Sequence, residues 1–222
     1  MTKAPHDPDP LLGYGVAGLA GALLTGLGEG LLQLSPGGNY ADSHYAYFAQ
    51  VPEARLFLGH FLSIASAPLY VAGYWHLTGN LLADHRRARL IVFAACAYAF
   101  VIGTVWIGQR AFLGLTVQAI DVGRADAILL AGFSALNEPL VNVLRITLLT
   151  FSVIWTLQIM RGRSHYPLWM AMLSPAVLIA VIFGVYILWP GPGSWLVPTA
   201  LNTAHAVLFS ASLCSLSFKV RS

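Results

Sequence analysis

Four side chains that can exchange protons fall inside apolar stretches of this sequence: Glu29, His60, Glu138 and His205. A carboxylic acid can donate a proton, and a histidine changes its charge near neutral pH, so both types suit general acid–base catalysis. Ionisable groups are costly among apolar residues and usually have a function or a partner there. We take these four residues as the candidate catalytic groups.

Other polar and aromatic side chains could bind a ligand close to these groups. Glu138, Asn142 and Arg145 recur at i, i+4 and i+7, so they form one stripe on a helix, which we expect to face away from lipid. An arginine can hold an anion, and an aromatic face can stabilise a carbocation. The candidate substrate-binding residues are Trp106, Gln109, Arg110, Asn142, Arg145, Tyr186 and Asn202.

Glu29 is the preferred acid because Thr25 and Gln33, one helical turn away on either side, can orient it without neutralising it. Glu138 comes second because Asn142 leads from it toward Arg145, and an Arg-paired carboxylate makes a poor acid. Three plainer interpretations stay open. Glu29 can extend to the membrane surface, the two carboxylates can form ion pairs with Arg110 and Arg145 that only fix the fold, and each histidine can simply bond a neighbouring helix.

The composition indicates a membrane protein. Hydrophobic residues make up 57% of the chain and charged residues 9%, with a mean hydropathy of +0.70, whereas soluble domains are roughly 25% charged. A membrane span needs about 20 apolar residues. We predict an all-α bundle of six transmembrane helices in one domain over 11–222, with 1–10 a disordered cytoplasmic tail and an outer interfacial segment at 114–137. The predicted spans are 11–34, 55–78, 90–113, 139–160, 167–189 and 196–218.

Basic residues set the predicted orientation. They gather at 86–89, at 161–163 and after the last span, and Lys3 lies in the N-terminal tail, so both termini are expected in the cytoplasm. These charges are dispersed over several helix ends, so they make no nucleic-acid footprint. The two cysteines, Cys96 and Cys214, lie in separate apolar segments and offer no zinc or disulfide motif. We expect no metal or other cofactor, and keep a haem bound between His60 and His205 as a minor alternative.

The predicted topology places the candidate residues at a similar depth. All of the polar ones lie within roughly ten residues, or about 15 Å, of the outer ends of their helices. Polar groups on several helices at one depth converge on an internal cavity, because facing lipid would leave them without partners. The loop at 35–54, with Tyr40, Tyr45, Tyr47 and Phe48, can form an aromatic belt at the headgroup level or a lid over this cavity.

Four short runs in the first third of the chain carry a resemblance: Gly28-Glu29-Gly30-Leu31-Leu32, Arg55-Leu56, Gly59-His60-Phe61-Leu62, and Leu69-Tyr70 with Gly73-Tyr74. They resemble small bacterial multi-pass proteins of unknown function, which implies a bacterial inner (cell) membrane location and no particular activity. In size, helix count and isolated intramembrane acids, the chain is also similar to the small integral-membrane terpene cyclases of meroterpenoid pathways. Those enzymes are thought to protonate an alkene or epoxide with an acidic side chain, which would point to Glu29 and Glu138.

Two functional hypotheses follow. In the first, the protein is a lyase- or isomerase-type enzyme that cyclises or isomerises a lipophilic isoprenoid by acid catalysis, with membrane lipids around it. In the second, it is a non-enzymatic carrier or sensor, in which Arg110 and Arg145 hold an anionic lipid headgroup or small solute and the carboxylates only balance them. The sequence leaves the oligomeric state open.

Overall fold

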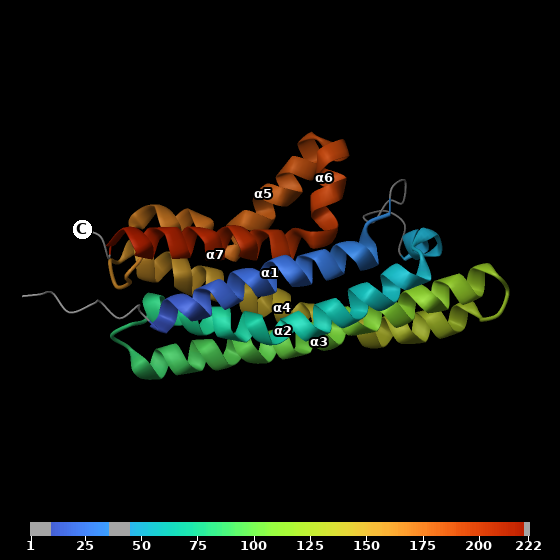
Figure 1. Ribbon diagram of the computed structural model, residues 1–222, viewed down its shortest axis with the longest axis horizontal. Helices are drawn as coiled ribbons and strands as arrows, with labels where there is room; N and C mark the ends of the chain where they lie inside the picture. The colour runs from blue at the N-terminus through green and yellow to red at the C-terminus, as the bar shows by residue number, and fades with distance from the viewer. Residues whose placement is uncertain (1–9, 36–44, 220–222) are drawn as a thin grey trace, which may run out of the picture.

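The chain is helical throughout the residues that the computed structural model describes, 10–35 and 45–219 (Figure 1). The predicted all-α, multi-pass architecture is confirmed, while the predicted tail at 1–10 lies almost entirely outside the described residues. Three short 3-10 segments, Ala46–Gln50, Leu168–Leu173 and Val197–Thr199, connect longer elements. The α-helices are α1 (Pro10–Gln33), α2 (Glu53–Leu81), α3 (Arg86–Asp121), α4 (Ala127–Met160), α5 (Pro175–Leu188), α6 (Pro190–Leu196) and α7 (Ala200–Lys219).

Five helical stretches are long and apolar enough to cross a membrane: Leu11–Gln33, Glu53–Leu81, Arg86–Asp121, Ala127–Met160 and Pro190–Leu216. Their outward faces carry large apolar side chains; Ile91 is 71% exposed and Ile146 67%. So much exposed apolar surface marks contact with an apolar environment, here the lipid. We call the end of the bundle that carries residues 45–53 the outer end, following the predicted orientation.

The predicted fifth span, 167–189, is interrupted. Leu168–Leu173 forms a 3-10 turn, Ser174 is extended, and α5 has only 14 residues, about 21 Å against a hydrocarbon core of about 30 Å. Pro175 starts α5, since proline lacks the N–H that a continuing helix would use. Side chains of α4 bond the backbone at the break: Trp155 Nε1 donates to Met170 O at 2.8 Å, and Ser152 Oγ accepts from Ala176 N at 3.0 Å.

The predicted interfacial segment at 114–137 is wrong, because its residues form the ends of two long helices and the turn between them. The helix α3 continues to Asp121 and α4 starts at Ala127, where Asp126 caps it by accepting a hydrogen bond from Ile128 N at 2.9 Å. With 36 residues, α3 is about 54 Å long. Its outer end and that of α4 extend past the other helices as a hairpin (Figure 1). The charges that suggested an excursion are concentrated in the turn and at its edges.

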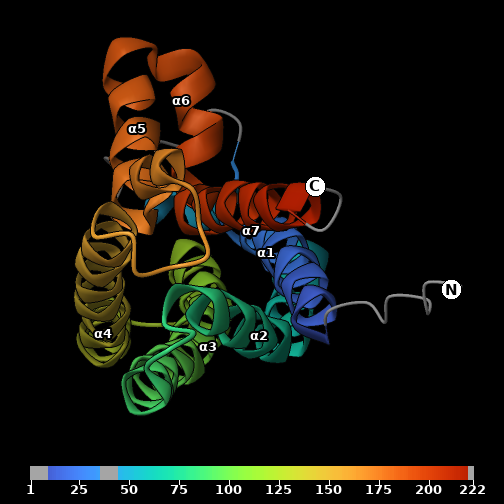
Figure 2. The same ribbon diagram turned by 90° about the vertical axis from the view of Figure 1, so that its left-hand side faces the viewer.

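Close packing of α1 on α2 sets the shape of the bundle. Seen along its length, α1 lies between α2 and α7, while α5 and α6 stand apart to one side (Figure 2). At the α1–α2 crossing, a Cβ added to Gly18 would lie 2.5 Å from Gly73 Cα and 2.7 Å from the ring of Phe209 in α7. The small-residue surface of α1 therefore lets two backbones touch, as in other membrane helix pairs.

A buried hydrogen-bond chain closes the opposite, inner end. His76 has no exposed surface; its Nδ1 lies 2.7 Å from Leu11 O and its Nε2 lies 2.8 Å from Ser212 Oγ. The Ser212 hydroxyl also lies 2.8 Å from Tyr166 OH, in the connection between α4 and α5, where burial raises the pKa of Tyr166 well above its usual value. This chain joins α1, α2 and α7 at the inner end, so the contacts of His76 are structural.

The Gly18 contact generates a stability prediction. Gly18→Ala places a methyl group against backbone and an aromatic ring that cannot both move, whereas Gly13→Ala meets no atom within 4 Å. We expect Gly18→Ala to lose about 1–3 kcal/mol and to lower the apparent Tm of the detergent-purified protein by roughly 5 °C. Gly13→Ala should melt with the wild type. Equal melting of the two variants would contradict this packing.

Candidate functional site

Glu29 is the most enclosed of the candidate acids, with 5% of its surface exposed. Gln33 Nε2 donates to its Oε1 at 3.0 Å, and Asn202 Nδ2 donates to its Oε2. Asn202 in turn accepts a hydrogen bond from Tyr70 OH through its Oδ1. Thr25, expected to help orient Glu29, instead lies 2.7 Å from Ser66 Oγ. Neutral amides from α1 and α7 therefore hold the carboxyl group, and a tyrosine of α2 fixes one of them.

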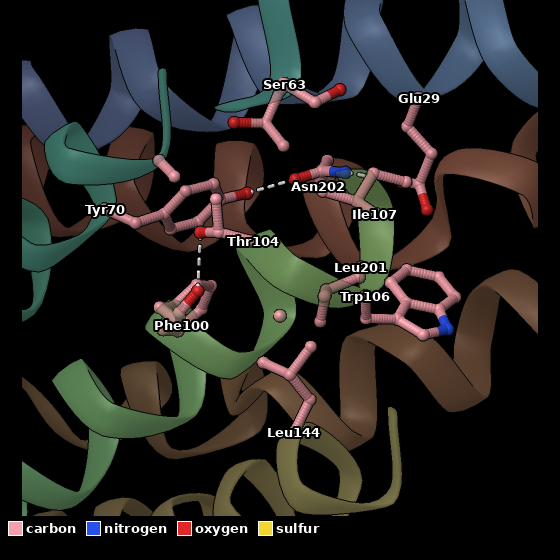
Figure 3. A pocket seen from close by; sticks show the side chains of 13 residues that line it. Glu29, Ser63, Tyr70, Phe100, Thr104, Trp106, Ile107, Leu144, Leu201 and Asn202 are labelled. Atoms are coloured by element: carbon pink, nitrogen blue, oxygen red, sulfur yellow. Dashed lines mark hydrogen bonds between the residues drawn. The ribbon is translucent and has the colours of Figure 1, made fainter. Parts of the chain in front are cut away.

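Glu29 lines a small cavity at the centre of the outer half of the bundle. Its volume is about 40 Å³, and its lining also includes Ser63, Tyr70, Trp106 and Asn202 (Figure 3). A space of this size can hold a water molecule beside its few polar groups, because a water needs only roughly 10–15 Å³ measured in this way. Ser63 Oγ is buried there and has no hydrogen-bond partner among the described residues. The cavity thus has mainly apolar walls with a few polar groups, and it lies between α1, α2, α3, α4 and α7.

A second, larger cavity adjoins the first and opens at the side of the bundle. We call it the lateral groove; its volume is about 440 Å³. Leu149, 60% exposed, and Phe183, 45% exposed, are among its wall residues, so it is open along the lipid-facing side. The groove is lined by Glu29, Trp106, Val141, Leu144, Arg145, Leu148, Leu149, Ala176, Ile179, Ala180, Phe183, Val197, Pro198, Ala200 and Leu201. Its polar lining groups are only the Glu29 carboxyl, the Trp106 indole and the Arg145 guanidinium.

The cavity and the groove share part of their lining, including Glu29 and Trp106. Trp106 is 9% exposed, and its indole Nε1 is buried with no hydrogen-bond partner among the described residues. A buried donor without an acceptor is costly and is usually explained by an unseen water or ligand. Trp106, predicted to bind substrate, therefore presents a hydrogen-bond donor next to the buried acid.

Arg110 forms its ion pair with Glu138 and not with Glu29. Its NH1 donates to Glu138 Oε1 at 3.2 Å, while its NH2 donates to Gln33 Oε1 at 3.0 Å and to Tyr47 OH at 3.1 Å. Tyr45 OH also donates to Glu138. This pair is one of the ion pairs that the sequence left open, whereas the predicted link from Glu138 through Asn142 toward Arg145 is absent among the described residues. Of the two candidate acids, Glu138 is the one bound by a guanidinium.

The loop before α2 covers this ion pair. Tyr47 and Phe48 are buried, and the Arg110 guanidinium carbon lies 5.0 Å from the ring centre of Tyr45. Gln118 of α3 fixes the loop by donating to Phe48 O at 3.0 Å. Burial raises the pKa of Tyr45, and so does its bond to Glu138, which keeps the phenol a hydrogen-bond donor at neutral pH. These aromatics cover the Arg110–Glu138 pair and line neither cavity, so the belt and the lid over the cavity both stay predictions; Tyr40 and the rest of 36–44 lie outside the described residues.

The two histidines lie apart from both cavities. His205 has no exposed surface, and both of its nitrogens are engaged: Nδ1 lies 2.7 Å from Leu201 O and Nε2 lies 2.8 Å from Tyr74 OH. His60 is half-buried, with Nδ1 2.9 Å from Gly108 O of α3. Because neither nitrogen of His205 is left for iron, the residues do not fit a haem bound between the two. Their contacts match the plainer interpretation, in which each bonds to a helix.

Of the remaining predicted binding residues, Arg145 lines the lateral groove and the others do not. Arg145 and Asn142 are exposed on α4, where Arg145 NH1 donates to Asn142 Oδ1 at 3.2 Å. Their exposure corrects the expectation that this stripe faces away from lipid. Gln109 accepts from Asn137 Nδ2 at 3.0 Å and so links α3 to α4. Tyr186 is half-buried against Gly193 in the α5–α6 turn and does not line the lateral groove.

Sequence reasoning missed Tyr70 and Ser63, which belong to the site. They are seven residues apart on α2, a spacing that places them on one helix face, but a tyrosine or serine in an apolar helix is common enough to carry little signal. The contact of Tyr70 with Asn202 depends on how α2 packs against α7, which the sequence alone does not indicate.

The fold and the site define a multi-pass helical membrane protein with a buried carboxyl group where a small cavity meets a lateral groove. The chain belongs to a family described as "Family of unknown function (DUF6796)", which matches residues 9–215, nearly the whole sequence. No curated protein and no solved structure matches it.

The Arg110 network generates a prediction about stability. Arg110→Gln removes a guanidinium that serves Glu138, Gln33 and Tyr47, so we expect a loss of about 2–4 kcal/mol. Glu138→Gln should lose only about 1 kcal/mol, because that side chain is 45% exposed and keeps hydrogen-bonding capacity. Thermal melts of the two single variants and the double variant test this. Additive losses would show that the two residues do not interact.

Proposed function

We propose that the protein is an integral-membrane enzyme that isomerises or cyclises a lipophilic, isoprenoid-type substrate by acid catalysis, with Glu29 as the acid. One observation carries the proposal. Glu29 is buried where the small cavity meets the lateral groove, and its hydrogen bonds come from the neutral amides of Gln33 and Asn202. The location is supported by the charge pattern and the bacterial resemblance: a bacterial cell membrane with both termini in the cytoplasm.

The contrast between the two carboxyl groups supports the choice of Glu29. A carboxylate that is bonded to an arginine gains stabilisation of its charged form and makes a poor proton donor. Glu138 is in that position, since it accepts from Arg110 and is partly exposed. Glu29 has only neutral amide partners, Gln33 and Asn202, which orient its two oxygens without adding an opposite charge beside it. The arrangement separates one paired carboxylate from one that is free to exchange a proton.

The lateral groove suits an apolar substrate. Its volume of about 440 Å³ lies within the roughly 300–1,000 Å³ typical of ligand pockets. Its walls are aliphatic apart from Phe183 and the three polar groups named above, and its open side allows a lipid-dissolved molecule to enter from the bilayer. Trp106 adds an indole face that can stabilise a cation and an N–H that can bind a substrate oxygen. Water gains few hydrogen bonds from such walls, so it competes weakly with an apolar substrate for the lateral groove.

The proposed reaction conserves the atoms of the substrate. The Glu29 proton adds to an alkene carbon, the π electrons form the new C–H bond, and the other alkene carbon becomes a carbocation. A second alkene can then supply its π electrons to close a C–C bond. Loss of a proton from an adjacent carbon to the Glu29 carboxylate forms the product alkene and restores the acid. The product is an isomer of the substrate, so the reaction needs no oxidant, reductant or co-reactant.

The carrier or sensor hypothesis depends on the arginines. Arg110 already donates to Glu138, Gln33 and Tyr47, so its donors serve the protein. Arg145 is the one that the structure leaves at the side of the groove. A carrier would thus have a single cationic contact, and it would not need a buried carboxyl group held by two amides. The site supports the enzyme better.

The test uses proteoliposomes incubated with a panel of acyclic prenyl alcohols, prenyl phosphates and their epoxides, followed by chromatography and mass spectrometry. We expect a product of unchanged mass and altered retention. Glu29→Gln should lower its rate by at least about 100-fold, since general acid catalysis contributes roughly 10²–10⁴-fold. Glu53→Gln, which removes an exposed carboxylate at the start of α2, should leave the rate unchanged. A folded Glu29→Gln protein with the wild-type rate would rule out this mechanism.

A further inference from the structure

Arg145 occupies an unusual position for a charged side chain. It lies on the exposed side of α4, beside Ile146, which is 67% exposed. Fifteen residues separate it from Met160 at the end of α4, about 22 Å along the helix and therefore within a hydrocarbon core of about 30 Å. A guanidinium at such a depth is costly unless an anion or water compensates it. An ionisable residue in this position is therefore a candidate binding residue.

The partners of Arg145 within the chain do not neutralise it. Its NH1 donates to Asn142 Oδ1 at 3.2 Å, a neutral acceptor one turn nearer the outer end of α4. Among the described residues the one ion pair is that of Arg110 with Glu138, so no described carboxylate neutralises Arg145. Arg145 is the one lysine or arginine among the residues that line the lateral groove. The charge is therefore available to an anionic ligand.

Three kinds of side chain line different parts of the lateral groove. Arg145 is exposed at its rim, aliphatic side chains form its walls, and Glu29 and Trp106 lie buried at its inner part. A neutral hydrocarbon would use only the walls, and a small anion would use only the rim. A molecule with an anionic head and one apolar chain would use the whole groove, and its chain would reach the acid.

We propose that the lateral groove binds a single-chain isoprenoid with a phosphate or diphosphate head, which Arg145 holds while the chain extends toward Glu29. This inference rests on the proposed function, because it names the class of substrate for the same site. Arg145 acts here as a binding residue, with Asn142 orienting its guanidinium. An arginine can bind two phosphate oxygens at once, which fixes the end of the chain and hence the alkene presented to Glu29.

Binding in a neutral detergent tests the inference without any need for turnover. The probes are farnesyl phosphate, farnesol as its uncharged analogue, inorganic phosphate, and phosphatidylglycerol as a two-chain anionic lipid. We expect saturable binding of farnesyl phosphate with a Kd at least tenfold below that of farnesol. Inorganic phosphate and phosphatidylglycerol should not displace it at comparable concentrations. Equal affinity for farnesol and farnesyl phosphate, or full displacement by either competitor, would overturn the proposal.

Substitutions of Arg145 and of a control arginine test where the head group binds. Arg145→Gln should weaken farnesyl phosphate binding at least tenfold and leave farnesol binding unchanged, and Arg145→Lys should keep part of the difference. Arg124→Gln is the matched control, since it removes an exposed arginine from the α3–α4 turn outside the groove. An equal loss in Arg124→Gln and Arg145→Gln would show a general charge effect and contradict the site.

Glu29→Gln separates this inference from the proposed function. It should bind farnesyl phosphate with the wild-type Kd, because the carboxyl group lies at the other part of the groove. If Glu29→Gln keeps full turnover while Arg145→Gln loses binding, the acid mechanism fails and the binding site stands. If Arg145→Gln binds normally while Glu29→Gln loses turnover, the head-group site fails and the acid mechanism stands.

Discussion

The buried carboxyl group of Glu29 depends on amides that come from two different helices. In an apolar interior, each oxygen of a carboxyl group needs a partner, and an unsatisfied one would cost several times the net value of a hydrogen bond. Gln33 supplies one bond from α1 and Asn202 supplies the other from α7, while Tyr70 of α2 holds Asn202. Three helices must therefore keep a fixed register. The close α1–α2 approach at Gly18 provides that register.

The same set of contacts separates opposite charges within a few turns of helix. Gln33 is the bridge: its Nε2 donates to Glu29, and its Oε1 accepts from Arg110. Arg110 in turn satisfies its charge with Glu138 on the outer side, beneath the aromatic loop. This arrangement lets a guanidinium lie near Glu29 without bonding to it. The groove beside Glu29 remains apolar, which is the environment that acid chemistry on a hydrocarbon requires.

The sequence predicts the helices and the polar residues of this site better than it predicts which of these residues contact one another. Composition predicts the all-helical membrane fold, and the helical spacing of Glu29 and Gln33 correctly predicts their contact. Periodicity places a residue on a helix face but does not say which helix it meets, so the choice of Arg110 for Glu138 could not be derived. Likewise, the charges at 121–126 were consistent with an interfacial excursion, whereas the structure shows that they belong to the turn of a long hairpin. Pro175 indicates the break at Ser174–Pro175 within the predicted fifth span, but the residues before it are as apolar as a continuous span and do not indicate a separate 3-10 turn.

The central claim is that Glu29, and not Glu138, is a carboxyl group that a molecule dissolved in the lipid can reach through the lateral groove. Dicyclohexylcarbodiimide tests it directly, because this apolar reagent partitions into membranes and adds to protonated carboxyl groups. After treatment of proteoliposomes and peptide mass spectrometry, the account predicts modification of Glu29, loss of that modification in Glu29→Gln, and little reaction at Glu138. An unmodified Glu29 in membranes where Glu138 or Glu53 reacts would contradict the account.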